Sequence, residues 1–288
     1  MLSRRGWIIA AALALALSGC SALRLAYNQA PNFVYWWFDA YADFDDAQTH
    51  AARGAIDAWF DWHRRTQLAD YAGLLARAAD EARQDTTPER TCQWWREIRD
   101  RADLAIDRAL PGVATVAATL SPEQLRHVDH HVEKSNAKFR DDYLDGDRAE
   151  RLRKVVQRTV ERAETVYGPL GDAQRDAIAQ RLAASPFDPE LWYAERQARQ
   201  RDARVLLARI ANDGMSREQA TGALRAWVAM ANRSPREAYR RYFEQLEQFN
   251  CRFVATLHNA ATPSQRQHAA DKLRGWEADL RTLAADRR

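Results

Sequence analysis

The chain has few lysines and cysteines, and it lacks the glycine-rich segments that bind phosphate. Only four of its 43 basic residues are lysine, and 40 acidic residues nearly balance them. A protein of this size that binds nucleic acid needs a strongly basic face, so nucleic acid is not an expected partner. The sequence also contains no phosphate loop, no nucleophile elbow and no His-Glu-x-x-His motif. We therefore do not expect an enzyme.

The longest apolar run at the start is too short to cross a membrane. Trp7 to Leu17 spans 11 residues, whereas a transmembrane helix needs about 20. Arg4 and Arg5 precede this run, and Leu17-Ser18-Gly19-Cys20 closes it. This order is typical of a bacterial lipoprotein signal cleaved between Gly19 and Cys20. The alternative, an uncleaved apolar anchor, conflicts with the length of the run.

Cys20 would become the first residue of the mature protein and carry the lipid. We expect a thioether-linked diacylglycerol and an N-acyl chain on Cys20, with export by the general secretion route and no other cofactor. Ser21 follows the cysteine; in enterobacterial lipoproteins, which this segment resembles, Asp at that position favours the inner membrane. The expected location is therefore the periplasmic face of the outer membrane. The predicted organisation is a signal peptide at 1–19, a lipidated tether at 20–30 and one domain at 31–288, with a possible internal boundary at 185–189.

Helix-start signals recur along the chain, and runs that alternate apolar and polar β-branched residues are missing. In a capping box, a Ser or Thr side chain caps the helix and Gln or Glu three residues later reaches back to the cap. These signals predict an all-α protein of about nine to eleven helices. We expect a helix that starts at Pro88 to end at Pro111-Gly112. The other starts are Ser121-Pro122-Glu123-Gln124, Ser216-Arg217-Glu218-Gln219, Ser234-Pro235-Arg236-Glu237 and Thr262-Pro263-Ser264-Gln265.

Phe33-Val34-Tyr35-Trp36-Trp37-Phe38 is the most apolar run of the mature chain. It has two interpretations. The run forms a short helix that caps the core, or it forms an aromatic belt at the membrane interface, where Trp and Tyr are favoured.

Besides Cys20, the chain has only Cys92 and Cys251. Export would allow a disulfide between them. The alternative is two small buried thiols, which are common in protein cores. The sequence leaves both possibilities open.

Three histidines lie on one predicted helix. His127, His130 and His131 are spaced at i, i+3 and i+4, so their rings share one flank and suit zinc or copper. Leu125 and Val128 mark the buried face of the same helix, however. That placement leaves much of the histidine flank near solvent, so a metal site is the weaker interpretation.

Trp62-His63-Arg64-Arg65 combines aromatic walls with guanidinium groups. Such a combination binds carboxylates, phosphates or sugars. Together with Tyr27 and Asn28 it forms a candidate surface for a ligand or partner. The alternative is that the tryptophan packs in the core while the arginines extend to solvent.

Many segments of the chain, in the same order, resemble uncharacterised proteobacterial lipoproteins classed as a domain-of-unknown-function family. The resemblance covers nearly the whole chain and implies a helical lipoprotein without a stated activity. Ala69 departs from the family, in which we associate this position with proline and a helix break. The matching segments are the lipobox, Arg24-Leu25-Ala26-Tyr27-Asn28, Trp36-Trp37, Tyr41, Asp43-Phe44, Gln48, Trp59, Trp62-His63-Arg64-Arg65, Leu120-Ser121-Pro122-Glu123-Gln124, Asn136, Tyr143 and Tyr167-Gly168.

A looser similarity is to small periplasmic stress chaperones, whose helices start with Leu-Thr-x-x-Gln. Any capping box after a leucine also produces this pattern. The matching segments are Leu120-Ser121-Pro122-Glu123-Gln124, Leu170-Gly171-Asp172-Ala173-Gln174 and Ala261-Thr262-Pro263-Ser264-Gln265.

These observations favour a lipid-anchored module that binds a partner in the cell envelope. A chaperone-like holder of unfolded envelope proteins is the alternative. A metal-dependent enzyme built on the histidines is the third hypothesis.

Overall fold

The computed structural model describes residues 22–286 of the chain. That part contains eleven α-helices and no strand, which confirms the all-α prediction. Gly19 and Cys20, the predicted cleavage and lipidation site, lie outside the described residues. The helices are α2 (Ala22–Ala42), α3 (Asp46–Thr66), α4 (Leu68–Glu81), α5 (Pro88–Ala117), α6 (Pro122–Tyr143), α7 (Arg148–Tyr167), α8 (Asp172–Ala183), α9 (Pro189–Asn212), α10 (Arg217–Asn232), α11 (Glu237–Asn259) and α12 (Pro263–Ala285).

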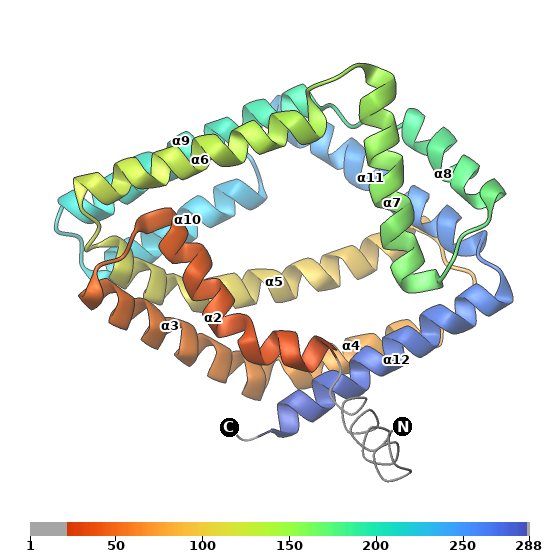
Figure 1. The fold of residues 1–288 in the computed structure, drawn as a ribbon, viewed down its shortest axis with the longest axis horizontal. Coiled ribbons are helices and arrows are strands. Elements are labelled where there is room, and N and C mark those ends of the chain that lie inside the picture. The colour runs from red at the N-terminus through yellow and green to blue at the C-terminus, as the bar shows by residue number, and fades with distance from the viewer. Residues whose placement is uncertain (1–21, 287–288) are drawn as a thin grey trace, which may run out of the picture.

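The helices form an all-α bundle that has the outline of a frame in the view of Figure 1. Helices α6 and α9 run side by side along one long edge, and α4 and α12 run side by side along the other. Helix α5 crosses between these edges and packs against α3, α10 and α11. None of the helices in residues 22–286 is long and apolar enough to cross a bilayer.

The buried residues fall into separate small clusters, as expected when helices pack pairwise around a frame. Alanine is frequent in these clusters, and it lets helices approach closely. The clusters are Leu110, Ala114, Ala117, Ile210, Ala220 and Leu224 between α5, α9 and α10; Val160, Ala163, Leu170, Ile178 and Phe253 between α7, α8 and α11; Ala82, Ala269 and Ala270 near α12; and Tyr239, Tyr242 and Leu246 on α11.

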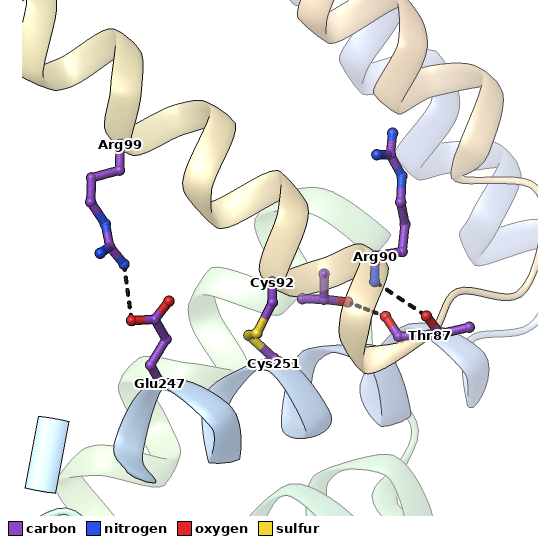
Figure 2. Close-up of a disulfide and its surroundings, with 7 residues drawn as sticks. Thr87, Arg90, Cys92, Arg99, Glu247 and Cys251 are labelled. Atoms are coloured by element: carbon purple, nitrogen blue, oxygen red, sulfur yellow. Dashed lines mark hydrogen bonds and ion pairs between the residues drawn. A yellow bond between two sulfur atoms is a disulfide. The ribbon is translucent and has the colours of Figure 1, made fainter. Parts of the chain in front are cut away.

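Helix α5 is cross-linked to α11. Cys92 and Cys251 form a disulfide with their Cα atoms 5.3 Å apart, and Figure 2 shows it joining the two helices. Two turns further along α5, Arg99 pairs with Glu247 at 3.1 Å. The covalent bond and the ion pair together hold α5 against α11.

The expected end of this helix at Pro111-Gly112 is wrong, because α5 continues to Ala117 with Pro111 inside it. Beyond the proline, Ala114 and Ala117 are fully or almost fully buried. Proline normally ends a helix, but the burial of this last stretch stabilises the helical conformation beyond Pro111. Gly112 faces α3, where an added Cβ would lie 2.8 Å from the Cβ of Ala55.

Residues 22–30 form the first half of α2, so the expected tether at 20–30 is corrected to a packed helix from Ala22 onward. The same helix includes the aromatic run at 33–38. Of the large side chains in this run only Tyr35 is buried, whereas Phe33, Trp36 and Trp37 are 58%, 55% and 57% exposed, so most of the run does not cap the core. Gln67 separates α3 from α4, so the helix break is present although Ala69 replaces the expected proline.

Candidate functional site

Tyr27, Asn28, His63 and Arg64 meet where α2 crosses α3, and we call this group the α2–α3 junction. The Tyr27 hydroxyl is 2.9 Å from Nδ1 of His63. The imidazole of His63 is stacked on Trp59, with ring centroids 4.6 Å apart. The edge-on ring of Tyr71 lies 5.3 Å away. His63 is therefore enclosed by aromatic rings from α2, α3 and α4.

This enclosure shifts the titration of both hydrogen-bonded groups. Burial lowers the pKa of His63 from 6.5 to about 4, because the charged imidazolium loses its hydration. Burial likewise raises the pKa of Tyr27 to about 12, although the nearby Arg64 opposes the shift. Both groups are therefore neutral at pH 7, which suits a packed contact better than a general base.

Arg64 is held by two other helices. Its guanidinium donates to the Asn28 side-chain oxygen at 2.8 Å and to the Leu283 carbonyl at 3.1 Å. It also lies 5.1 Å from the ring centroid of Tyr27. These contacts fix the planar fork within the protein, so Arg64 joins α2, α3 and α12 rather than presenting a free anion site.

Trp62 and Arg65 lie on a different side of α3. The ring of Trp62 is contacted by the guanidinium of Arg108 at 5.7 Å. Arg65 is exposed and pairs with Asp61 one turn earlier. The structure thus divides the predicted surface. Tyr27, Asn28, His63 and Arg64 are brought together by packing. Trp62 touches this group only through an edge contact with His63, with ring centroids 6.2 Å apart, and Arg65 points to solvent.

The histidine cluster lies at the start of α6 but does not form a metal centre. His127 Nε2 is 3.1 Å from the carbonyl oxygen of Ala40, and the ring of His131 lies 5.2 Å from Tyr41. Desolvation lowers the pKa of His131, and the nearby His127 lowers it further by a smaller amount. Across residues 22–286, no group of three or more His, Cys, Asp or Glu is arranged to hold a metal ion. His127 and His130 instead line an open hollow of about 320 Å³.

Two pairs of glutamines form junctions that the sequence analysis missed. Gln48 and Gln124 each occupy the third position of a capping box, on α3 and α6. Each side-chain oxygen accepts from its own cap backbone, and each side-chain amide donates to the other glutamine. Gln124 also donates to the carbonyl of Asp43, whose φ of 51° is in the left-handed region. The pair therefore ties two helix starts together.

The same arrangement recurs at the starts of α8 and α12. Gln174 donates to Gln265 at 2.8 Å, and Gln265 donates back at 3.0 Å. Each also donates to a backbone carbonyl of the other segment, Ala260 and Pro169 respectively. In the sequence, each of these glutamines is recognisable only as a member of its own capping box. The pairing of one box with another far along the chain has no local signal.

An apolar stripe on α5 remains uncovered. Trp95, Ile98, Ala102 and Ile106 recur at helical spacing and fall on one face of the helix. The side chains of Trp95, Ile98 and Ile106 are 46%, 49% and 41% exposed, and Ala102 is also exposed. We call these four residues the α5 stripe. It lies on the helix that the Cys92–Cys251 disulfide joins to α11.

Comparison with known proteins places these features in a family. A family model described as a family of unknown function, DUF6279, matches residues 40–224. The chain belongs to the DUF6279 family. This confirms the resemblance to a domain-of-unknown-function family, while the lipoprotein and chaperone assignments stay predictions. No curated protein and no solved structure matches the chain. The matched part of this DUF6279 protein includes the Gln48–Gln124 pair and the α5 stripe, whereas α2 up to Asp39 precedes it.

Proposed function

We propose that this DUF6279 protein is a lipid-anchored outer-membrane protein that faces the periplasm and works by binding a protein partner. The observation that carries the proposal is the α5 stripe. A continuous apolar surface on a solvent-facing helix is typical of a site that a partner covers. The partner would place an apolar helix or extended segment along Trp95, Ile98, Ala102 and Ile106.

The rigidity of α5 supports this use. The helix is held by the Cys92–Cys251 disulfide. On α3, Trp59 donates from its indole nitrogen to the carbonyl of Ala105 at 2.9 Å. A surface that is already fixed loses little conformational entropy on binding, which favours affinity for one defined partner.

The proposed compartment agrees with the cysteine chemistry. Disulfides persist in exported proteins and are rare in the cytosol. The lipobox that ends in Cys20 would direct export and attachment. Metabolic labelling with a radioactive fatty acid tests this part, because the wild-type chain should become labelled and the Cys20→Ala variant should not. Labelling of neither chain would overturn the lipid anchor.

A photoreactive amino acid at Ile98 in intact cells tests the binding surface. We expect one discrete crosslinked adduct, which mass spectrometry would identify. The matched control is Asp100, which is also exposed but lies roughly 200° around the same helix, and it should give no such adduct. A lack of adducts at Ile98, or equal adducts at both positions, would refute the α5 stripe as the binding surface.

A chaperone-like holder is the second candidate. The observation that favours it is that the three helix starts resembling Leu-Thr-x-x-Gln, at Gln124, Gln174 and Gln265, all take part in paired helix starts. A holder would give many different adducts at Ile98. It would also suppress the aggregation of unrelated unfolded proteins, and Ile98→Asp with Ile106→Asp would reduce that suppression.

A further inference from the structure

Helix α2 exposes an apolar face on the side away from the protein body. Eight uncharged residues recur at spacings of three and four and therefore share one face about 120° wide. All eight are exposed, and Leu25 is the most exposed of the large apolar residues at 63%. We call this surface the α2 outer face. Its residues are Ala22, Leu25, Ala26, Gln29, Phe33, Trp36, Trp37 and Ala40.

The opposite side of α2 attaches the helix to the body through polar groups. Arg24 pairs with Asp279 of α12 at 3.3 Å. Tyr35 is buried and its hydroxyl lies 3.0 Å from the hydroxyl of Thr49. Tyr27 contacts His63 in the α2–α3 junction. The inward side also carries apolar residues, among them Leu23, Val34 and the buried Ala42. An ordinary surface helix exposes a polar side, so α2 differs in being apolar on both sides.

The α2 outer face carries no charge. The only charged residues of the helix are Arg24 and Asp39. Arg24 points to α12, and Asp39 accepts a hydrogen bond from the backbone amide of Phe44 at 3.1 Å. An uncharged strip rich in Trp and Phe is the composition that bilayer interfaces favour. Because none of the described helices suits a membrane span, α2 would lie in the plane of the interface.

We propose that the α2 outer face rests in the interface of the bilayer that holds the lipid of Cys20. This inference deepens the proposed function, because it relies on the lipid anchor. Cys20 precedes Ala22 by two residues, so the Cα atoms of the anchor and of the helix start are at most about 7 Å apart. The anchor therefore keeps the start of this face at the membrane surface. A second copy of the chain would have no such constraint.

A membrane contact along α2, in addition to the lipid anchor, would fix how the protein is oriented on the membrane. The lipid anchor on Cys20 holds the chain at one point only, which leaves the body free to rotate about that point. A second contact along α2, about 30 Å long, fixes the orientation of the frame on the membrane. The α5 stripe would then face a defined direction.

Vesicle flotation with the unlipidated mature chain tests the proposal, with Cys20→Ser removing the anchor. The probe is a vesicle of phosphatidylethanolamine and phosphatidylglycerol. We expect the chain to float with the vesicles, and added salt to leave this unchanged because the face is uncharged. Trp36→Ser with Trp37→Ser should weaken binding by roughly tenfold. The matched control is Val205→Ser on α9, an apolar residue of similar exposure, which should bind like the parent chain.

Three results would overturn the proposal: no flotation of the parent chain, equal flotation of the Trp36/Trp37 variant, or equal loss in the Val205 variant. Helix content by circular dichroism establishes that the variants are folded. Ultracentrifugation without lipid completes the test. A dimer that the Trp36/Trp37 substitutions abolish would assign the face to a second copy instead. Flotation requires neither lipidation nor the α5 partner, so its failure is distinguishable from failure of the proposed function.

Discussion

Gln48 and Gln124 exchange side-chain hydrogen bonds across 76 residues of sequence, with the Gln48 amide donating to the Gln124 oxygen at 3.0 Å. Both side chains are buried, at 3% and 9% exposure. Each oxygen also accepts from the backbone of its own helix cap. One pair of amides therefore satisfies two helix starts and joins them.

Removal of one member should cost more than removal of an ordinary capping glutamine. Gln48→Ala removes one partner from each side-chain atom of the buried Gln124 and leaves the Asp45 backbone amide without its acceptor. We therefore expect a loss of about 2 kcal/mol in the free energy of unfolding. The matched control is Gln219→Ala on α10, an exposed capping box, with an expected loss of about 1 kcal/mol or less. Urea unfolding measures both. Equal losses would contradict a special role for the pair.

Gly112 should not tolerate a methyl group. An alanine Cβ there would lie 2.8 Å from the Cβ of Ala55 on α3, so α3 and α5 would have to move apart. We expect Gly112→Ala to destabilise the protein by about 1 to 3 kcal/mol. Gly222→Ala on α10 meets nothing within 4 Å and should instead stabilise it by up to about 1 kcal/mol. Thermal unfolding of both variants checks the opposite signs.

The Cys92–Cys251 disulfide should make a large contribution to stability. It closes a separation of 159 residues, and the loop-entropy model predicts a loss of about 5 kcal/mol when the bond is removed. We expect Cys92→Ser with Cys251→Ser to lower the urea midpoint markedly. Cys20→Ser serves as the control and should leave the midpoint unchanged. A parent chain that unfolds at the same midpoint with and without a reductant would argue against the bond.

His63 should make stability depend on pH in a defined direction. Its folded pKa of about 4 lies below the ordinary 6.5, so the unfolded chain binds the proton first as the pH falls. The stabilisation is complete above pH 6.5 and is lost progressively between pH 6.5 and 4. After allowance for solvent screening, we expect about 2 kcal/mol.

Urea unfolding at pH 7 and pH 5 measures the free energy of unfolding of the parent chain and of the His63→Gln variant. The variant should lose less stability than the parent over this interval, because no imidazole remains to be protonated. His130→Gln replaces an exposed histidine and should follow the parent. Parallel curves for the parent and His63→Gln would show that the histidine is not held neutral.

Several helix starts could be predicted from the sequence because a helix cap is formed by residues within about three positions of each other. Thr87 caps α5 with Pro88 at the first position, and Thr262 with Gln265 forms the capping box of α12. Ser234 was less informative: α11 begins after Arg236, while the Ser234 hydroxyl accepts from the Arg236 amide instead. Residues two or three apart decided most of these boundaries, and no distant segment was needed.

The candidate site was harder to predict because a helix distributes neighbouring residues to different sides. His63 and Arg64 face α2, whereas Trp62 contacts Arg108 of α5. Adjacent residues on a helix are separated by about 100°, so four consecutive letters do not define one surface. The sequence shows the motif Trp62-His63-Arg64-Arg65, but it does not show which of these side chains pack against other helices and which face solvent.

The sequence by itself determined the helical class, most helix starts and the lipobox prediction, since each depends on residues close together in the chain. Only the tertiary structure decided the rest. It continued α5 through Pro111 by burying Ala114 and Ala117, and it brought Cys92 to Cys251 and Gln48 to Gln124. It also left one apolar face of α2 exposed. These outcomes depend on which distant helices meet, and free energy from such contacts outweighs local preference.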